Sequence, residues 1–191
     1  MTMTTEAKAS TRERLLEAAA TLTYREGTGV GIQALCQAAG VSKRSLYQLF
    51  DSKDELLAVS LERGAPAYKA WLLPPAGDDR SPRERILHVF GQLESQSAAP
   101  DFQGCRYLAV QIELKDPTHP ASRVARGVKD DLTGFFRAEA DRGGARDPDL
   151  LARQLMLIFD GASARAGVGA DDLAGLVSPT VGGLLDAAGL R

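Results

Sequence analysis

The residues best suited to recognising another molecule lie in the stretch AGVSKRSLYQLFDSK, from Ala39 to Lys53. Arginine and lysine can read guanine, glutamine can read adenine, and a small hydroxyl residue can approach any base. A tyrosine hydroxyl and a further lysine can hold phosphates. Nucleic acid is therefore the ligand that these side chains suit, and the residues predicted to contact it are Ser42, Lys43, Arg44, Ser45, Tyr47, Gln48 and Lys53.

These side chains can face one ligand only if a short helix presents them together. Gly40 suits a turn between two helices, because a residue without Cβ can adopt a positive φ. Ser42 is predicted to cap the second helix, with Val41 and Leu46 at the spacing of a hydrophobic staple. The apolar residues predicted to pack on the preceding helices are Leu46, Leu49 and Phe50.

Two adjacent basic residues alone would favour a simpler interpretation, a solvated helix face. The turn glycine, the cap, the staple and the flanking helical patterns are all in register with them, which favours a helix-turn-helix that binds DNA. In such a motif the second helix enters the major groove and its N-terminal residues reach the base edges.

The remaining reactive side chains do not form a catalytic or metal-binding pattern. His88 and His119 are the only histidines, and they stand at no ligand spacing with each other or with Cys36 and Cys105. The sequence also lacks a glycine-rich phosphate loop and a nucleophile–base pair, so neither an enzyme nor a cofactor is expected. Cys36 is predicted to lie in the core; Cys105 begins a predicted helix, which leaves open whether its thiol is redox-active.

Composition places the chain among ordinary globular proteins. Of its 191 residues, 44% are hydrophobic and 25% charged, and no apolar run approaches the ~20 residues of a membrane-spanning helix. The N-terminus lacks the apolar core of a signal peptide, so a cytoplasmic location is expected. Net charge is −2, yet residues 1–50 carry six basic and four acidic groups. This mildly basic N-terminal part matters only if its cations share one face.

Helical periodicity runs through the chain and predicts an all-α protein of about nine helices. Ser10, Ser52 and Ser81 each precede a glutamate by three residues, the spacing of a capping box. One segment, 105–114, fits either a strand or a helix; a lone strand would have no partner, so we expect a helix. Pro179 lies inside the last pattern, which predicts either a kink or a helix that restarts at Ser178. The apolar residues of that last pattern are Leu173, Leu176, Val181, Leu184 and Leu185.

These elements predict three parts of the chain. Residues 1–9 are expected to form a disordered tail. Residues 10–55 are expected to form the DNA-binding domain, with the helix-turn-helix motif at 31–50. Residues 56–191 are expected to form a helical domain for ligand binding and dimerisation.

The segment from Thr11 to Glu62 resembles the DNA-binding domain of the TetR family of bacterial transcriptional regulators. The matching pieces are TRERLLEAA, Gly27, GVSK, LYQLF and SKDELL; together they are specific, although each alone is weak. A later stretch, GCRYLAVQIELKDPTHPASRVA from Gly104 to Ala125, resembles the middle of the regulatory domain in one branch of that family.

The resemblance implies a homodimer that binds double-stranded operator DNA and is released by a small inducer. It also implies base and phosphate contacts from the seven residues named above. Two departures from the family pattern stand out. The GTGVGI spacer is about one residue short and lacks a Thr/Ser pair to cap the next helix, so Gly31 or the preceding backbone must serve. Arg44 replaces a small residue, which would change the DNA sequence that is read.

The predicted function is thus a sequence-specific transcriptional regulator, a repressor that leaves a near-palindromic operator when an unidentified small molecule binds. A helical binding protein that keeps the motif as a scaffold, or an activator, is the alternative. Small residues on the last two helices (Gly161, Ala162, Ala166, Gly182 and Gly183) would permit the close helix crossings of the dimer interface that the family implies. Aromatic residues can enclose an apolar pocket, and the candidates to line it are Trp71, Phe90, Cys105, Tyr107, Phe136 and Phe159.

Overall fold

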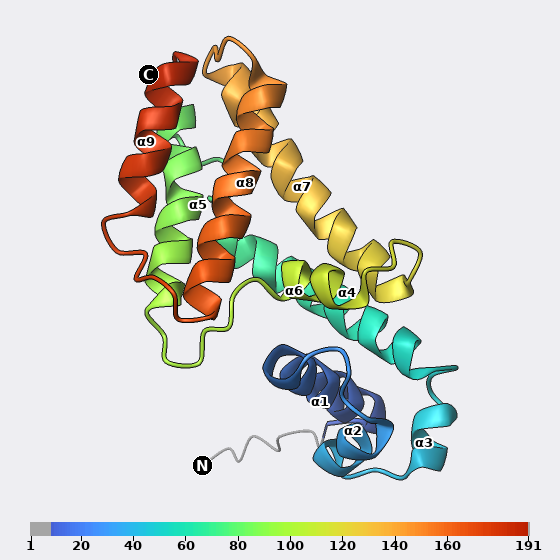
Figure 1. The fold of residues 1–191 in the computed structure, drawn as a ribbon. Helices are drawn as coiled ribbons and strands as arrows, with labels where there is room; N and C mark the ends of the chain where they lie inside the picture. Colours follow the sequence, from blue (N-terminus) through green and yellow to red (C-terminus); the bar gives the residue numbers. More distant parts are fainter. Residues whose placement is uncertain (1–8, 191) are drawn as a thin grey trace, which may run out of the picture.

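The computed structural model describes residues 9–190, and in this range it contains nine helices and no strand, which confirms the all-α prediction (Figure 1). All but the last residue of the expected N-terminal tail lie outside the described residues. None of the helices in this range is both long and apolar enough to cross a membrane. The helices are α1 (Thr11–Glu26), α2 (Ile32–Ala39), α3 (Lys43–Tyr47), α4 (Lys53–Leu72), α5 (Pro82–Ser97), α6 (Arg106–Leu114), α7 (Pro120–Arg142), α8 (Pro148–Gly167) and α9 (Val177–Ala188).

Serine caps begin three of these helices, as the sequence predicts. The side chains of Ser10, Ser52 and Ser81 each accept a hydrogen bond from the backbone N–H three residues on, which satisfies a donor that the helix leaves free. Only Ser81 forms the complete capping box, in which the Glu84 carboxylate also accepts from the Ser81 N–H at 2.8 Å.

The ambiguous segment is a helix, α6, which ends where Lys115 adopts a left-handed conformation with φ 52°. The last helix differs from its prediction. It begins at Val177, so Leu173 and Leu176 lie before it and Ser178 is inside it rather than its cap. Pro179 occupies the first turn, where its missing N–H costs no helical hydrogen bond, so the chain needs neither a kink nor a second cap.

The elements form two packed groups joined by one helix (Figure 1). We call α1–α3 the head and α5–α9 the body. The first turns of α4 pack on α1, where Leu56 is buried and the Ser60 hydroxyl donates to the Leu16 carbonyl at 2.9 Å. The same helix packs on α7. Helix α4 therefore contributes side chains to the cores of both groups.

Aromatic rings fill the centre of the body. Phe90 of α5 stacks on Phe136 of α7 with ring centroids 5.6 Å apart, and it meets Phe159 of α8 edge-on at 6.2 Å. All three side chains are at most 1% exposed. Their burial anchors α5, α7 and α8 to one another, because large apolar side chains contribute most of the free energy of packing.

Candidate nucleic-acid interface

The turn between α2 and α3 fixes the direction in which α3 leaves the head. Gly40 ends α2 in the left-handed region, at φ 62° and ψ 42°. Its N–H and that of Val41 donate to carbonyls of the last turn of α2, a closure typical of helix ends. Arg14 of α1 donates to the Gly40 carbonyl at 3.3 Å, so the turn is also held from outside.

Two buried side chains hold α3 against the rest of the head. Leu46 is fully buried and Phe50 is 3% exposed, with the Arg12 guanidinium 5.5 Å from the centre of the Phe50 ring. The prediction that Leu49 also packs inward is wrong, because this side chain is 40% exposed. Helix α3 already ends at Tyr47, so Leu49 no longer follows the helical face on which Leu46 lies.

The opposite side of α3 is presented to solvent. Lys43, Arg44 and Gln48 are exposed, and Tyr47 is 52% exposed. Within the described part of the chain, neither Lys43 nor Arg44 forms an ion pair. Two cations, a phenol and an amide thus lie together and free to bind, on a helix of the size that a DNA major groove admits.

The other three candidate residues already have partners within the chain. Ser42 caps α3 through the Ser45 N–H at 3.0 Å, and the hydroxyls of Ser42 and Ser45 lie 2.9 Å apart. Lys53 is half-buried, and its Nζ donates to the carbonyls of Thr28 and Val30 at 3.0 and 3.3 Å. A phosphate contact from Lys53 would compete with these two hydrogen bonds.

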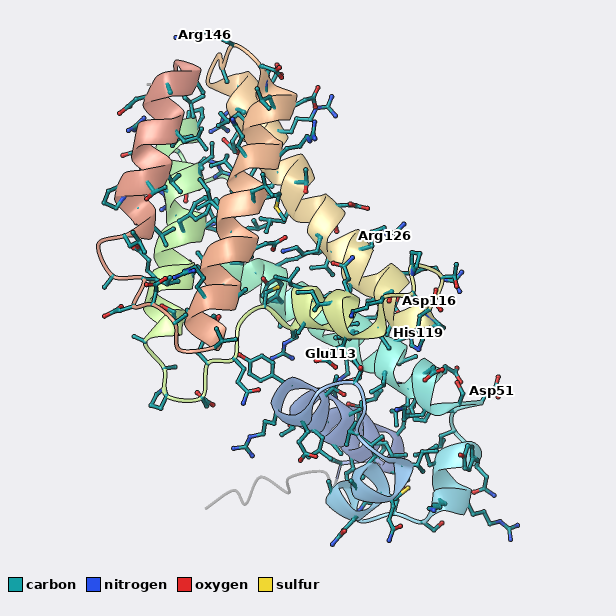
Figure 2. The ribbon with its side chains drawn as sticks, in the orientation of Figure 1. Asp51, Glu113, Asp116, His119, Arg126 and Arg146 are labelled. Atoms are coloured by element: carbon teal, nitrogen blue, oxygen red, sulfur yellow. The ribbon has the colours of Figure 1, made fainter. Side chains whose placement is uncertain are left out.

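The corner between α1 and α2 has no side-chain cap. Gly31 occupies the N-cap position of α2, as the shortened spacer predicts. Thr28, in the same corner, instead binds the body: its N–H and its hydroxyl donate to Glu113 Oε2 of α6 at 2.5 and 2.8 Å. Figure 2 shows Glu113 on the side of α6 that faces the head. The sequence gives no local signal for this contact, because 85 residues separate its partners.

A second set of contacts joins the head and the body at Tyr24. Its hydroxyl accepts from the Gln103 N–H at 2.8 Å and donates to the Gly104 carbonyl at 3.3 Å. The Arg106 guanidinium lies 5.0 Å from the centre of the same ring, a cation–π arrangement. Tyr24 therefore ties the end of α1 to the start of α6, and Thr28, just after α1, binds Glu113 near the end of α6.

The candidates for an inducer pocket lie in two places. Phe90, Phe136 and Phe159 form the packed aromatic centre of the body described above. The remaining three surround Tyr68 of α4: its ring centroid is 5.9 Å from that of Trp71 and 5.0 Å from that of Tyr107, and its hydroxyl lies 3.6 Å from Cys105 Sγ.

The second group is tightly packed and polar at its centre. Tyr107 is fully buried and donates to the Leu61 carbonyl at 3.2 Å; burial raises its pKa to about 12. Burial also raises the pKa of Tyr68, and the neighbouring Cys105 adds to that rise. Both phenols therefore stay protonated at neutral pH, and Tyr107 already donates its proton to the Leu61 carbonyl.

A cavity of about 290 Å³ lies elsewhere, between the head and the body. Its walls come from the end of α1, the buried face of α4 and the inner face of α6. None of the six candidate pocket residues lines it. Sequence reasoning missed this site because residues from three separated helices form it.

Residues 15–59 match the family model described as bacterial regulatory proteins, tetR family. Over 126 residues the chain is 32% identical to the HTH-type transcriptional repressor NemR of Escherichia coli. That alignment covers 62% of this chain and 63% of NemR, less than two thirds of either.

Solved structures extend the likeness to more than nine tenths of the chain. A TetR transcriptional regulator from Streptomyces avermitilis is 71% identical, with a TM-score of 0.94 over 96% of this chain and 100% of that one. A TetR-family regulator from Streptomyces coelicolor is 27% identical, with a TM-score of 0.82 over 93% and 95% of the two chains. The reduced form of NemR, at 22% identity and a TM-score of 0.78 over 92% and 95%, shares the fold.

Proposed function

This chain belongs to the TetR family of bacterial regulatory proteins, and from that premise we propose that it is a DNA-binding transcriptional repressor which a small molecule releases from its operator. The observation that carries the proposal is the exposed face of α3. Lys43, Arg44, Tyr47 and Gln48 face solvent there, while Leu46 and Phe50 fix the helix from behind. NemR is named a transcriptional repressor, and this supports repression over activation as the activity of the present chain.

The side chains on and beside α3 would make different kinds of contact with DNA. Lys43, Arg44 and Gln48 would reach base edges in the major groove, and Tyr47 would donate to a phosphate. Ser42 and Ser45 would act first as the cap that sets the helix start, and Lys53 would hold the α1–α2 corner. The long side chain of Arg44 would set much of the sequence preference.

A homodimer through α8 and α9 would place two such helices on one face of DNA. Support comes from apolar side chains on α8 that the chain itself leaves uncovered: Leu157 is 73% exposed and Leu150 is 47% exposed. Gly161 continues the same face and allows a close helix approach. The operator would then be a near-palindrome with half-sites about one helical turn, or slightly more, apart.

Release by an inducer requires a ligand that binds two arrangements of the dimer with different affinity. Moving the population almost completely takes about 5.5 kcal/mol of difference. The contacts of Tyr24 at the start of α6 and of Thr28 with Glu113 near its end would transmit a shift in the body to the head. The position of α3 in one protomer relative to its partner would change with them.

Enrichment of DNA fragments on the purified full chain would supply the operator, and a mobility-shift titration at fixed salt would test its recognition. Replacing Lys43 and Arg44 by alanine removes two cations from each of two heads. At about 1 kcal/mol for each of four lost base contacts, affinity should fall about a thousandfold.

The matched control replaces Arg123 and Arg126, two exposed arginines of α7, by alanine, and it should bind as the wild type does. Equal affinity for the K43A/R44A variant and this control would refute the recognition surface. A wild-type chain that enriches no sequence would refute DNA binding itself and favour the helical binding protein.

A further inference from the structure

The cavity between the head and the body has an interior suited to a small organic molecule. Its volume, about 290 Å³, is close to the lower end of the ~300–1,000 Å³ that ligand pockets span. Leu57 and Leu61 of α4 and Val110 of α6 give it an apolar wall. This wall would cover the apolar part of a ligand of moderate size.

The polar groups of the cavity include one that has no partner. Thr23 Oγ1 is buried and makes no hydrogen bond with any described residue, although its side chain lines the cavity. Buried hydroxyls are nearly always paired, so an unpaired one in a cavity wall indicates room for a polar ligand atom.

The cavity wall carries two arginines and two glutamates, and no ion pair in the described part of the chain includes any of the four. Arg25, Glu26 and Glu113 are all exposed to solvent, which screens their charges, and Glu113 Oε2 accepts from Thr28; the guanidinium of Arg106 belongs to the one half-buried residue among the four.

A neighbouring hollow of about 250 Å³ shares Arg25 and Arg106 and adds two further acidic groups. Glu17 there is paired with Arg63, and Asp101 forms no ion pair with either shared arginine. The stacking of Arg106 on Tyr24 also orients its guanidinium, which suits the paired hydrogen bonds that arginine forms with a carboxylate.

We propose that this cavity binds a small organic monocarboxylate, with the carboxylate on Arg106 and the apolar part against Leu57, Leu61 and Val110. Binding there changes how the head is set against the body, because the walls come from both and the contacts of Tyr24 and Thr28 lie beside it. The binding step stands by itself; its regulatory consequence rests on the proposed repressor function.

The binding step is tested by calorimetry on the full chain without DNA. The probes are acetate, butyrate and hexanoate, with hexanamide as the neutral match to hexanoate. Affinity should rise about fourfold for each further methylene that the cavity covers, from about 0.8 kcal/mol per buried methylene. Hexanamide should bind at least tenfold more weakly than hexanoate, since it lacks the charge that Arg106 recognises.

Two variants locate the site. Ala109→Leu fills the cavity and should abolish hexanoate binding, while Ala138→Leu, on an exposed position of α7, should leave it unchanged. Arg106→Gln should weaken binding at least tenfold, with thermal unfolding measured to confirm that it folds. No hexanoate binding by the wild type, equal binding by A109L, or equal affinity for hexanamide would overturn the proposal.

The regulatory consequence is read separately, from operator affinity with and without saturating hexanoate. A change in affinity that A109L loses supports it; unchanged operator affinity of hexanoate-bound wild type overturns it. If the wild type binds no operator, the proposed repressor function is refuted. Whether the cavity binds a monocarboxylate would then still be decided by calorimetry.

Discussion

The contact between Glu113 and Thr28 predicts a measurable loss when the carboxylate is removed. Both the N–H and the hydroxyl of Thr28 donate to Glu113 Oε2, and Thr28 is only 8% exposed. In Glu113→Ala the buried N–H loses its acceptor, and no described group stands in for it. Leaving a buried donor unpaired costs about 1–3 kcal/mol of the free energy of unfolding.

For a chain of this length, each kcal/mol lowers Tm by roughly 2–4 °C, so Glu113→Ala should lower it by roughly 2–12 °C. Glu113→Gln keeps an acceptor oxygen without the charge and should lose less, because charged acceptors form the stronger hydrogen bonds. Thermal unfolding measures the total effect, and hydrogen exchange at the Thr28 amide measures the contact itself. The Thr28 amide should exchange faster in Glu113→Ala than in the wild type.

The matched control is Glu62→Ala, which removes an exposed glutamate on α4 that makes no hydrogen bond or ion pair with a described residue. Its Tm and its Thr28 exchange should equal those of the wild type within error. Identical Thr28 exchange in Glu113→Ala and Glu62→Ala would show that the carboxylate does not hold the α1–α2 corner, and the reasoning about the contact would fail.

Three further results are expected. Gly40→Ala places a Cβ at φ 62° and should lower the free energy of unfolding, measured by urea titration, by about 1–2 kcal/mol. Gly29→Ala, at an ordinary φ with open space around it, should lower it little, and equal losses in the two variants would contradict the turn geometry. Burial, together with the nearby Arg80 charge, lowers the pKa of His88 below the ordinary value of about 6.5, so the unfolded chain takes up the proton first. Stability should therefore fall as the pH drops through 6.5, and His88→Gln should show a shallower fall between pH 7.5 and pH 5; parallel curves would exclude this group. Leu157→Glu should yield a monomer in sedimentation at micromolar concentration, and a persistent dimer would place the interface elsewhere.

Features that depend on neighbours in the chain could be predicted from the sequence. The serine caps at Ser10, Ser42 and Ser52 bond to an amide three residues away, so spacing alone contains the information. The Gly40 turn is of the same kind. The helix at α6 is predicted by a different argument, because a lone strand in this chain would have no strand to pair with. The structure confirms that this segment is a helix.

Features that depend on where a helix ends, or on distant parts of the chain, could not be predicted. Leu49 has the apolar character of a core residue, but the early end of α3 turns it outward. The sequence shows no partner for Lys53, yet its Nζ donates hydrogen bonds to the backbone carbonyls of residues 28 and 30. Whether an aromatic residue packs in a core or lines a cavity depends on which helices meet around it. Phe136 and Phe159 pack in such a core, while Tyr24 lines the cavity beside the head.

The position of α4 has a consequence for how this protein can be divided. Leu56, Leu57 and Ser60 complete the core of the head, yet they belong to the helix that also packs on α7. A fragment ending at residue 55 would expose the face of α1 on which Leu15 and Leu16 lie, so it would not be an autonomous folding unit. Heads could be exchanged between relatives only with the first turns of α4 attached. The two groups of helices should also melt in a single cooperative transition, because neither core is complete without the helix they share.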